Sequence, residues 1–383
     1  MNAKTKSHSK NPPGGEHRPD YAVPPGATIA EALEERGMSQ RDLAARLGIQ
    51  DTVLSDLIHG RRPITPETAR GLELVLRIPM AFWLRAEARF REHKARIEET
   101  EKYRQWASWA QKFPLREMMK LGWLRAIETK QTAARVKALL SFLGVASPEA
   151  WDDSYDRMQI AYRKTRAFPI DENHLGAWLR HGENEALEMD IPAYSRTAFL
   201  ILMKQMREWS AGSGDIPLEK IQKACADCGV ALVYTPALPK SRAAGATRWV
   251  SAGRPLIQLS LRGKTDDHFW FTLFHEAAHV LEHGHKQTFV GLDDSEDQKE
   301  IEANRWAADH LIPPAAWSGF LTGKQFSPSA ILNFAKSQRI ASGIVVGRLQ
   351  REGKLANSAC NKLKKTVTFP SAAKSREHLA YAA

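Results

Sequence analysis

The spacing of apolar positions divides the chain into a helical first half and a mixed second half. From residue 27 to about residue 212, apolar residues recur with the periodicity of amphipathic helices. Short apolar runs over residues 230–234 and 256–260 have the length and the Val, Ile and Leu content of buried strands. We therefore expect a mostly helical protein that contains a small sheet in its C-terminal half.

Two short amphipathic segments near the N-terminus have the pattern of a helix-turn-helix. Helices are predicted over residues 40–47 and 50–60, and Gly48 makes the turn between them. Their apolar positions lock the two helices together and leave polar positions facing outward for the major groove of DNA. Asp51 and Asp56 lie on the second helix and would repel phosphates unless they cap it or accept from cytosine. The predicted DNA contacts are Ser39, Gln40, Arg41, Thr52, Ser55, His59, Arg61 and Arg62.

The clearest chemical pattern is His275-Glu276-Ala277-Ala278-His279, which lies in an apolar stretch over residues 269–281. Histidines four residues apart share one helical face, so their nitrogens can reach the same Zn²⁺ ion. Glu276 follows the first ligand and can accept a proton from water at the metal. Apolar residues nearly all round predict a helix buried inside a domain. The pattern indicates a zinc site with Glu276 as its general base.

Two histidines do not complete a zinc site, and the sequence offers several third ligands. Glu300 and Asn304 share a helical face, so Glu300 can bind the metal while Asn304 holds another ligand in place. Glu302 is the second choice. His285 stands where a longer histidine pattern has its third ligand, and His283 would face the metal only in a helix that continued straight.

Residues 245–313 resemble the ImmA/IrrE family of zinc metallopeptidases. The resemblance rests on Gly245-Ala246-Thr247-Arg248-Trp249, on the His-Glu-x-x-His helix, and on Glu300-x-Glu302-Ala303-Asn304 followed by Leu311-Ile312-Pro313. It implies a thermolysin-like metal site and a protein substrate, often a repressor. It also implies that His275 and His279 are ligands, that Glu276 is the base, and that the third ligand is acidic.

Residues 24–95 resemble the HigA-like antitoxin group of XRE-type helix-turn-helix repressors. The resemblance rests on Met38-Ser39-Gln40, Leu47-Gly48, Gly60-Arg61-Arg62-Pro63-Ile64-Thr65-Pro66 and Phe82-Trp83-Leu84. It implies sequence-specific DNA binding, usually by a homodimer on an inverted-repeat operator.

Composition agrees with a DNA-binding protein that does not cross a membrane. The formal net charge of the 383 residues is +11, which favours a polyanionic partner. No apolar run approaches the roughly 20 residues of a membrane span, and no signal peptide is recognised, so we expect a cytoplasmic protein. Cys225 and Cys228 lack a second pair with which to form a four-thiolate site, so we assign them to packing.

These patterns predict an α-rich, multidomain protein. It combines an all-α helix-turn-helix domain with an α+β, thermolysin-like zinc metallopeptidase domain that contains a small sheet. The expected parts are a disordered basic tail over residues 1–22, the helix-turn-helix domain over 23–95, a helical connecting region over 96–212, the metallopeptidase domain over 213–355 and a disordered tail over 356–383.

The predicted function is a transcriptional regulator fused to a zinc-dependent endopeptidase that cleaves a regulatory protein, a toxin or the chain itself. The alternative is a HigA-like antitoxin or repressor whose zinc domain is a sensor without proteolysis. A further alternative is a peptidase whose N-terminal bundle only docks the substrate. The candidates for stabilising the oxyanion are Arg348, His310 and His283.

Overall fold

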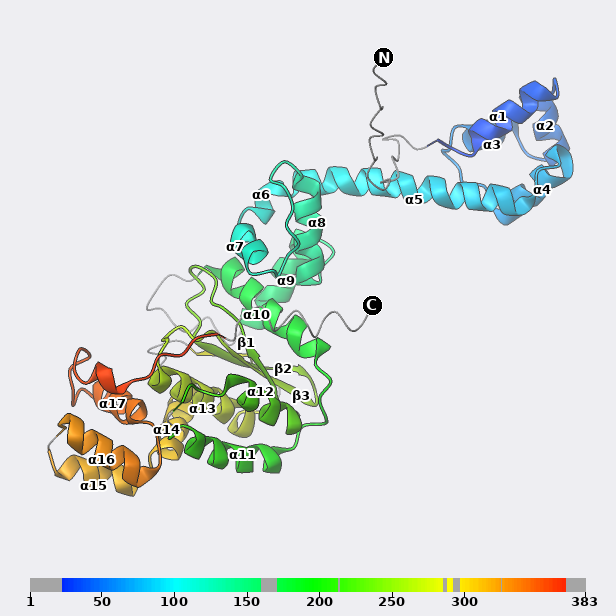
Figure 1. Ribbon diagram of the computed structural model, residues 1–383. Helices are drawn as coiled ribbons and strands as arrows, with labels where there is room; N and C mark the ends of the chain where they lie inside the picture. The colour runs from blue at the N-terminus through cyan, green and yellow to red at the C-terminus, as the bar shows by residue number, and fades with distance from the viewer. Residues whose placement is uncertain are drawn as a thin grey trace, which may run out of the picture. The chain divides into compact units, whose positions relative to one another are not determined.

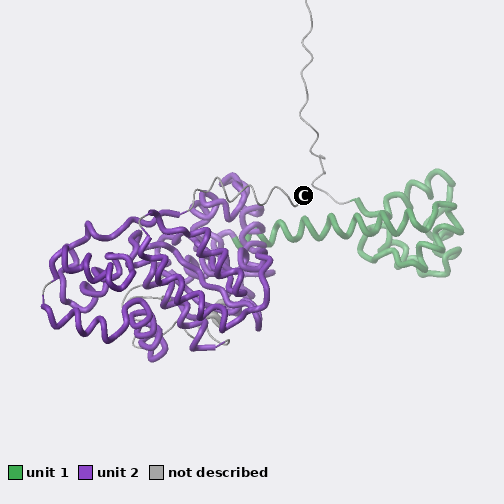
Figure 2. The backbone as a smooth tube through the Cα atoms, turned by 60° about the horizontal axis from the view of Figure 1, so that its bottom comes forward, with its two compact units in different colours: residues 1–106 green, residues 107–383 purple. Residues whose placement is uncertain are grey.

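The computed structural model describes residues 23–159, 171–212, 214–284, 288–291, 297–324 and 326–369. It divides into two compact units, residues 1–106 and residues 107–383 (Figure 2). The tail expected over residues 1–22 lies outside the described residues, and so do residues 370–383. No helix in the described part of the chain is long and apolar enough to cross a membrane.

The first unit is a helical bundle around the predicted helix-turn-helix. Ser39 caps α2 by accepting from the backbone N–H of Asp42, and Gly48 ends α2 with φ of 68°, a left-handed conformation that suits glycine. α5 continues to residue 105, so the domain boundary that we expected at residue 95 falls inside a helix. The helices are α1 (Gly26–Glu35), α2 (Gln40–Leu47), α3 (Asp51–Ile58), α4 (Pro66–Leu76) and α5 (Met80–Gln105).

The second unit consists of helices around a small sheet, as Figure 1 shows. The helices before the sheet are α6 (Ala107–Ala110), α7 (Leu115–Lys120), α8 (Thr132–Leu143), α9 (Pro148–Gln159), α10 (Glu172–Glu188), α11 (Arg196–Trp209) and α12 (Leu218–Asp227). The later ones are α13 (Asp266–Glu282), α14 (Gln298–Leu311), α15 (Pro314–Thr322), α16 (Pro328–Gln338), α17 (Ser342–Arg351) and the 3-10 helix η1 (Asn361–Leu363).

The sheet has the strand order β1-β3-β2-β4 and is mixed. β1 (Ala231–Tyr234) runs parallel to β3 (Arg254–Leu259), while β2 (Gly245–Ser251) pairs antiparallel with β3 and with β4 (Phe289–Gly291). β1 and β3 confirm the two predicted strands. β2 and β4 were not predicted, because β2 places polar side chains in buried positions and β4 is only three residues long.

The two faces of the sheet are covered by different helices. Successive residues of a strand point to opposite faces. Thr247 accordingly points to α13, where its hydroxyl oxygen lies 3.0 Å from the backbone carbonyl oxygen of Glu276. Arg248 instead points to α10 and donates to the carbonyl of Leu179. The apolar core joins Ile257 of the sheet, which is 0% exposed, and Phe269 of α13, which contacts Tyr234 of β1. This core therefore holds α13 firmly against β2 and β3.

Residues 356–369 are folded, which corrects the expectation of a disordered tail from residue 356. Thr366 forms a β-bridge with Thr265, just before α13. The backbone N–H of Lys365 donates to Asp266 Oδ1 at 2.9 Å, and Lys364 Nζ forms an ion pair with Asp267 Oδ2 at 2.6 Å. The segment thus supplies partners to two buried carboxylates in the first turn of α13.

Removing this segment should destabilise the second unit. A chain that ends at Leu355 leaves the buried carboxylates of Asp266 and Asp267 without these partners, which costs several kcal/mol. We expect the Tm of the second unit to fall by on the order of 10 °C. Scanning calorimetry would measure it, with a chain ending at Phe369 as the control that keeps every described contact. An unchanged Tm for the shorter chain would contradict the role of this segment.

Candidate functional site

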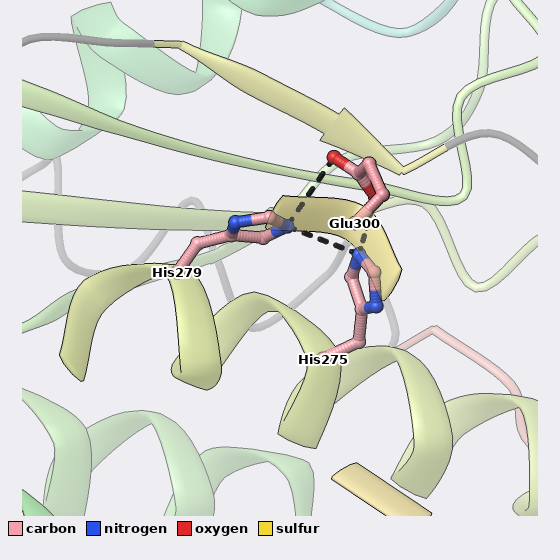
Figure 3. Close-up of side chains that lie close together, drawn as sticks. All are labelled: His275, His279 and Glu300. Carbon is pink, nitrogen blue, oxygen red and sulfur yellow. Dashed lines mark hydrogen bonds and ion pairs between the residues drawn. The ribbon is translucent and has the colours of Figure 1, made fainter. Parts of the chain in front are cut away.

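The described residues bring three predicted metal ligands together at the second unit's core. His275 and His279 lie one turn apart on α13, and their Nε2 atoms are 3.2 Å apart. Glu300 on α14 places Oε2 3.0 Å from His275 Nε2 and Oε1 3.4 Å from His279 Nε2 (Figure 3). All three residues are buried, and their ligand atoms lie within 4.8 Å of one another. This group could hold a metal ion.

Each histidine is oriented by a contact at its other ring nitrogen. His275 Nδ1 lies 3.1 Å from Asn304 Oδ1, which matches the role expected for Asn304. His279 Nδ1 lies 2.9 Å from His283 Nδ1, and the ring of Phe289 stacks on His279 at a centroid distance of 4.0 Å. A hydrogen bond donated by Nδ1 leaves the lone pair of Nε2 available, as a metal ligand requires.

The two other proposed third ligands that the structure describes, Glu302 and His283, do not join the group. Glu302 lies two residues after Glu300, which rotates its side chain by about 200° around the helix axis. Its carboxylate instead contacts His283 Nε2 at 3.2 Å. His283 thus bridges His279 and Glu302 outside the group. His285 lies outside the described residues.

Glu300 and His279 have the ionisation states of metal ligands, whereas His275 favours its protonated form more than a free imidazole does. Burial raises the pKa of Glu300, but hydrogen bonds from His275 and His279 outweigh it and hold the pKa at about 2. Burial lowers the pKa of His279 to about 4, so its ring is neutral. Burial also acts to lower the pKa of His275, yet the contact with Glu300 leaves that pKa raised. A metal ion requires the neutral form of His275, so it would compete with the proton that Glu300 favours there.

Glu276 is held beside the group by strand β2. The side chain is 0% exposed, and burial raises its pKa to about 7. Thr247 Oγ1 donates to Glu276 Oε2 at 2.7 Å, whereas Oε1 has no hydrogen-bond partner among the described residues. A Cβ atom on Gly245 would lie 2.5 Å from Oε1, so only glycine leaves room for the carboxylate there. Sequence reasoning assigned no role to Gly245 or Thr247, although both lie in the stretch that carries the family resemblance.

The oxyanion candidates have structural partners instead. The Arg348 guanidinium donates to the backbone carbonyls of Ala308 and Ile312 and pairs with Glu352 at 2.9 Å. His310 Nδ1 donates to the carbonyl of Trp306. Arg348 and His310 therefore secure the end of α14, and the oxyanion role stays an untested prediction.

All eight predicted DNA contacts lie in the first unit and are at least partly exposed. Asp56 does not stand alone on α3, because Arg61 Nε donates to its Oδ1 at 2.7 Å. Asp51 is in the first turn of α3, where the helix dipole favours a negative charge. His59 Nδ1 donates to the carbonyl of Ser55. The two aspartates are thus compensated locally, and the basic side chains remain at the surface.

Two segments of the chain match models of known protein families. Residues 29–83 match the family model described as Helix-turn-helix, and residues 225–321 match a peptidase family model described as IrrE N-terminal-like domain. The chain contains both of these domains. The predicted combination of a helix-turn-helix domain and an ImmA/IrrE-type domain is therefore confirmed. The His-Glu-x-x-His helix and Glu300 both lie within the IrrE-like domain.

Two solved structures are similar to a small part of this chain. A putative antidote protein of a plasmid maintenance system from Nostoc punctiforme is 26% identical, with 22% of this chain and 91% of that chain covered and a TM-score of 0.21. An addiction module antidote protein of a HigA family from Coxiella burnetii is 27% identical, with 22% and 92% covered and a TM-score of 0.20. The comparison with curated proteins found no match.

The arrangement of the group predicts which substitutions abolish metal binding. Alanine at His275, His279 or Glu300 should remove bound zinc, whereas Glu302→Ala should keep it, because Glu302 lies outside the group. Asn304→Ala should weaken zinc affinity about 10- to 100-fold, as the loss of a group that orients a ligand does. Elemental analysis and competition with a chelating dye would measure both effects. Loss of zinc from Glu302→Ala with full retention in Glu300→Ala would refute this assignment.

Proposed function

We propose that this protein is a DNA-binding regulator that carries a zinc-dependent endopeptidase acting on a regulatory protein or toxin. The observation that carries the proposal is the convergence of His275, His279 and Glu300 beside the buried carboxylate of Glu276. The match to a peptidase family over residues 225–321 supports it. The helix-turn-helix domain in the same chain supports a regulatory substrate rather than a nutritional one.

The donor set fits zinc. Two imidazole nitrogens and one carboxylate are the ligands of catalytic zinc sites that keep a fourth position open for water or substrate. The unpartnered Oε1 of Glu276 supports the fit, because a buried carboxylate oxygen normally has a hydrogen-bond partner. A bound Zn²⁺ would supply Lewis acidity toward the substrate carbonyl and toward water.

Residues of the chain itself would then accept the proton of the attacking water and return it to the leaving amine. Glu276 Oε1 is the free acceptor for a proton from the attacking water, while Thr247 holds the other oxygen in place. A pKa near 7 suits a group that accepts a proton and then returns it to the leaving amine. Asn304 and His283 would keep the two imidazoles aligned throughout.

We further propose that the helix-turn-helix domain binds an inverted-repeat operator as a homodimer. The exposed Thr52 and His59 and the partly exposed Ser55, on and after α3, are available to base edges. Arg41, Arg61 and Arg62 are available to phosphates. The net charge of +11 favours association with DNA.

Glu276→Gln should separate metal binding from catalysis. The amide keeps the shape of the side chain but cannot accept the proton, so we expect cleavage to fall about 10²- to 10⁴-fold while zinc is retained. Zinc-loaded wild type and variant would be incubated with a diverse peptide library and with co-encoded partner proteins, and products would be identified by mass spectrometry. The full chain alone would be followed for self-cleavage. If the zinc-loaded wild type yields no product in any of these assays, the sensor without proteolysis is favoured.

Replacing both Arg61 and Arg62 by alanine should weaken DNA binding. The change removes two phosphate contacts and leaves Asp56 unpaired, so we expect weaker binding to the chain's own upstream DNA and a salt slope reduced by about 2. Mobility-shift assays at several salt concentrations would measure this. Asp56→Asn with both arginines intact is the control, and it should keep the salt slope. Unchanged affinity in the double variant would contradict this placement of the DNA-binding face.

A further inference from the structure

The metal group is flanked by two pairs of an aromatic ring and a cation. On the side of His275, the ring of Phe271 lies 6.3 Å from the imidazole, between centroids, and Arg351 Cζ lies over Phe271 at 4.5 Å. On the side of His279, Phe289 stacks on the imidazole, and Lys299 lies over Phe289 at 5.6 Å. A peptide bound across the group would therefore pass a basic side chain on each flank.

The two flanks differ in their balance of charge. Near Lys299 stands the carboxylate of Glu302, whose pKa is lowered by hydrogen bonds from Gln298 and His283 and, to a smaller extent, by the charge of Lys299. The cation on the His279 flank is thus offset by an anion. On the His275 flank, by contrast, no ion pair joins Arg351 to any residue that the structure describes, and the nearby carboxylate of Asp267 is paired with Lys364.

Arg351 also differs from Arg348, one turn earlier on the same helix. Arg348 is 16% exposed, donates to two carbonyls and pairs with Glu352, so its hydrogen-bonding capacity is used by the fold. Arg351 is exposed at the end of α17, which packs against α13. Its described contact is the face of Phe271, a partly buried ring on α13. A guanidinium that lies on an aromatic face keeps its N–H edges directed outward, where a carboxylate can accept two parallel hydrogen bonds.

We infer that Arg351 selects substrates with an Asp or Glu side chain on the His275 side of the scissile bond. The inference rests on the proposed endopeptidase function and names its substrate class. The two ring contacts place Arg351 Cζ within about 11 Å of the His275 ring. An extended peptide rises about 3.3 Å per residue, so a side chain about three residues from the scissile bond can reach Arg351. Since Glu302 offsets Lys299, the acidic preference belongs to one side of the bond and not to the other.

The test compares the zinc-loaded full chain with two substitutions of Arg351. Arg351→Met keeps a long apolar side chain for packing on Phe271 and removes the charge, whereas Arg351→Glu reverses it. Lys336→Glu is the control, because it makes the same change in net charge at an exposed position in the last turn of α16. Each protein is incubated with a mixture-based peptide library, and the cleaved bonds are mapped by mass spectrometry.

The preferred acidic peptide is then synthesised with Gln or Asn in place of the acidic residue. We expect the wild type and Lys336→Glu to favour the acidic peptide about tenfold in kcat/KM, the scale of one charge-assisted hydrogen bond. Arg351→Met should lose this preference, and Arg351→Glu should favour a Lys or Arg at the same position. Fluorescence anisotropy on Glu276→Gln should show the same tenfold ratio in Kd between the two peptides, and adding Arg351→Glu to this variant should abolish the ratio.

Two results would count against the inference in distinguishable ways. If the wild type cleaves library peptides without an acidic preference, or if the preference survives in Arg351→Glu, the role of Arg351 is refuted and the endopeptidase remains. If the zinc-loaded wild type cleaves no library peptide, no co-encoded partner protein and not its own chain, the proposed function fails and the inference fails with it. If it cleaves only a protein, the absence of an acidic residue on the His275 side of the mapped bond refutes the role of Arg351.

Discussion

The architecture of the IrrE-like domain depends on one buried carboxylate. The carboxylate of Glu300 contacts the Nε2 atoms of both His275 and His279, and these contacts join α14 to α13. An unpaired carboxylate at such a depth would cost several kcal/mol, so an ionised Glu300 requires the two imidazoles or a bound cation. The packing of α13 against α14 therefore also pairs these buried polar groups. Asn304 and His283 complete the pairing, because each contacts the Nδ1 atom of one of the two imidazoles.

Strand β2 also pairs buried polar groups, and it does so on both faces of the sheet. Thr247 gives Glu276 a hydrogen bond on the α13 face. On the other face, Arg248 is buried against α10, where it donates to the carbonyl of Leu179 and pairs with Glu183 at 3.2 Å. A shift of one residue in the pairing of β2 would exchange the two faces and leave both Glu276 and Glu183 without these partners. Polar contacts thus reinforce the register that the apolar core favours.

Local spacing explains how much of this could be predicted from the sequence. His275 and His279 are one turn apart, and Glu300 with Asn304 repeats the same interval, so helical geometry alone placed each pair on one face. Gly245 and Thr247 could not be assigned roles in this way, because their contact with Glu276 joins a strand to a helix 29 residues away. The fold of residues 356–369 could not be predicted for the same reason. Their basic, small-residue composition is typical of a disordered tail, and the contacts that hold them are made with Asp266 and Asp267 at the start of α13.

The unpartnered oxygen of Glu276 indicates that this carboxylate serves the chemistry of the site and not the stability of the fold. A buried acceptor without a partner destabilises a fold by about 1–3 kcal/mol, and an apolar residue of similar size would avoid that penalty. Asp266 and Asp267 also have unpartnered oxygens, but there Lys364 and Lys365 supply charge and hydrogen bonds that tie a segment to α13. Glu276 bonds only one of its two oxygens and forces glycine at position 245, so its second oxygen stabilises no element of the domain. An acceptor kept open beside three convergent ligand atoms is instead what proton transfer at a metal site requires.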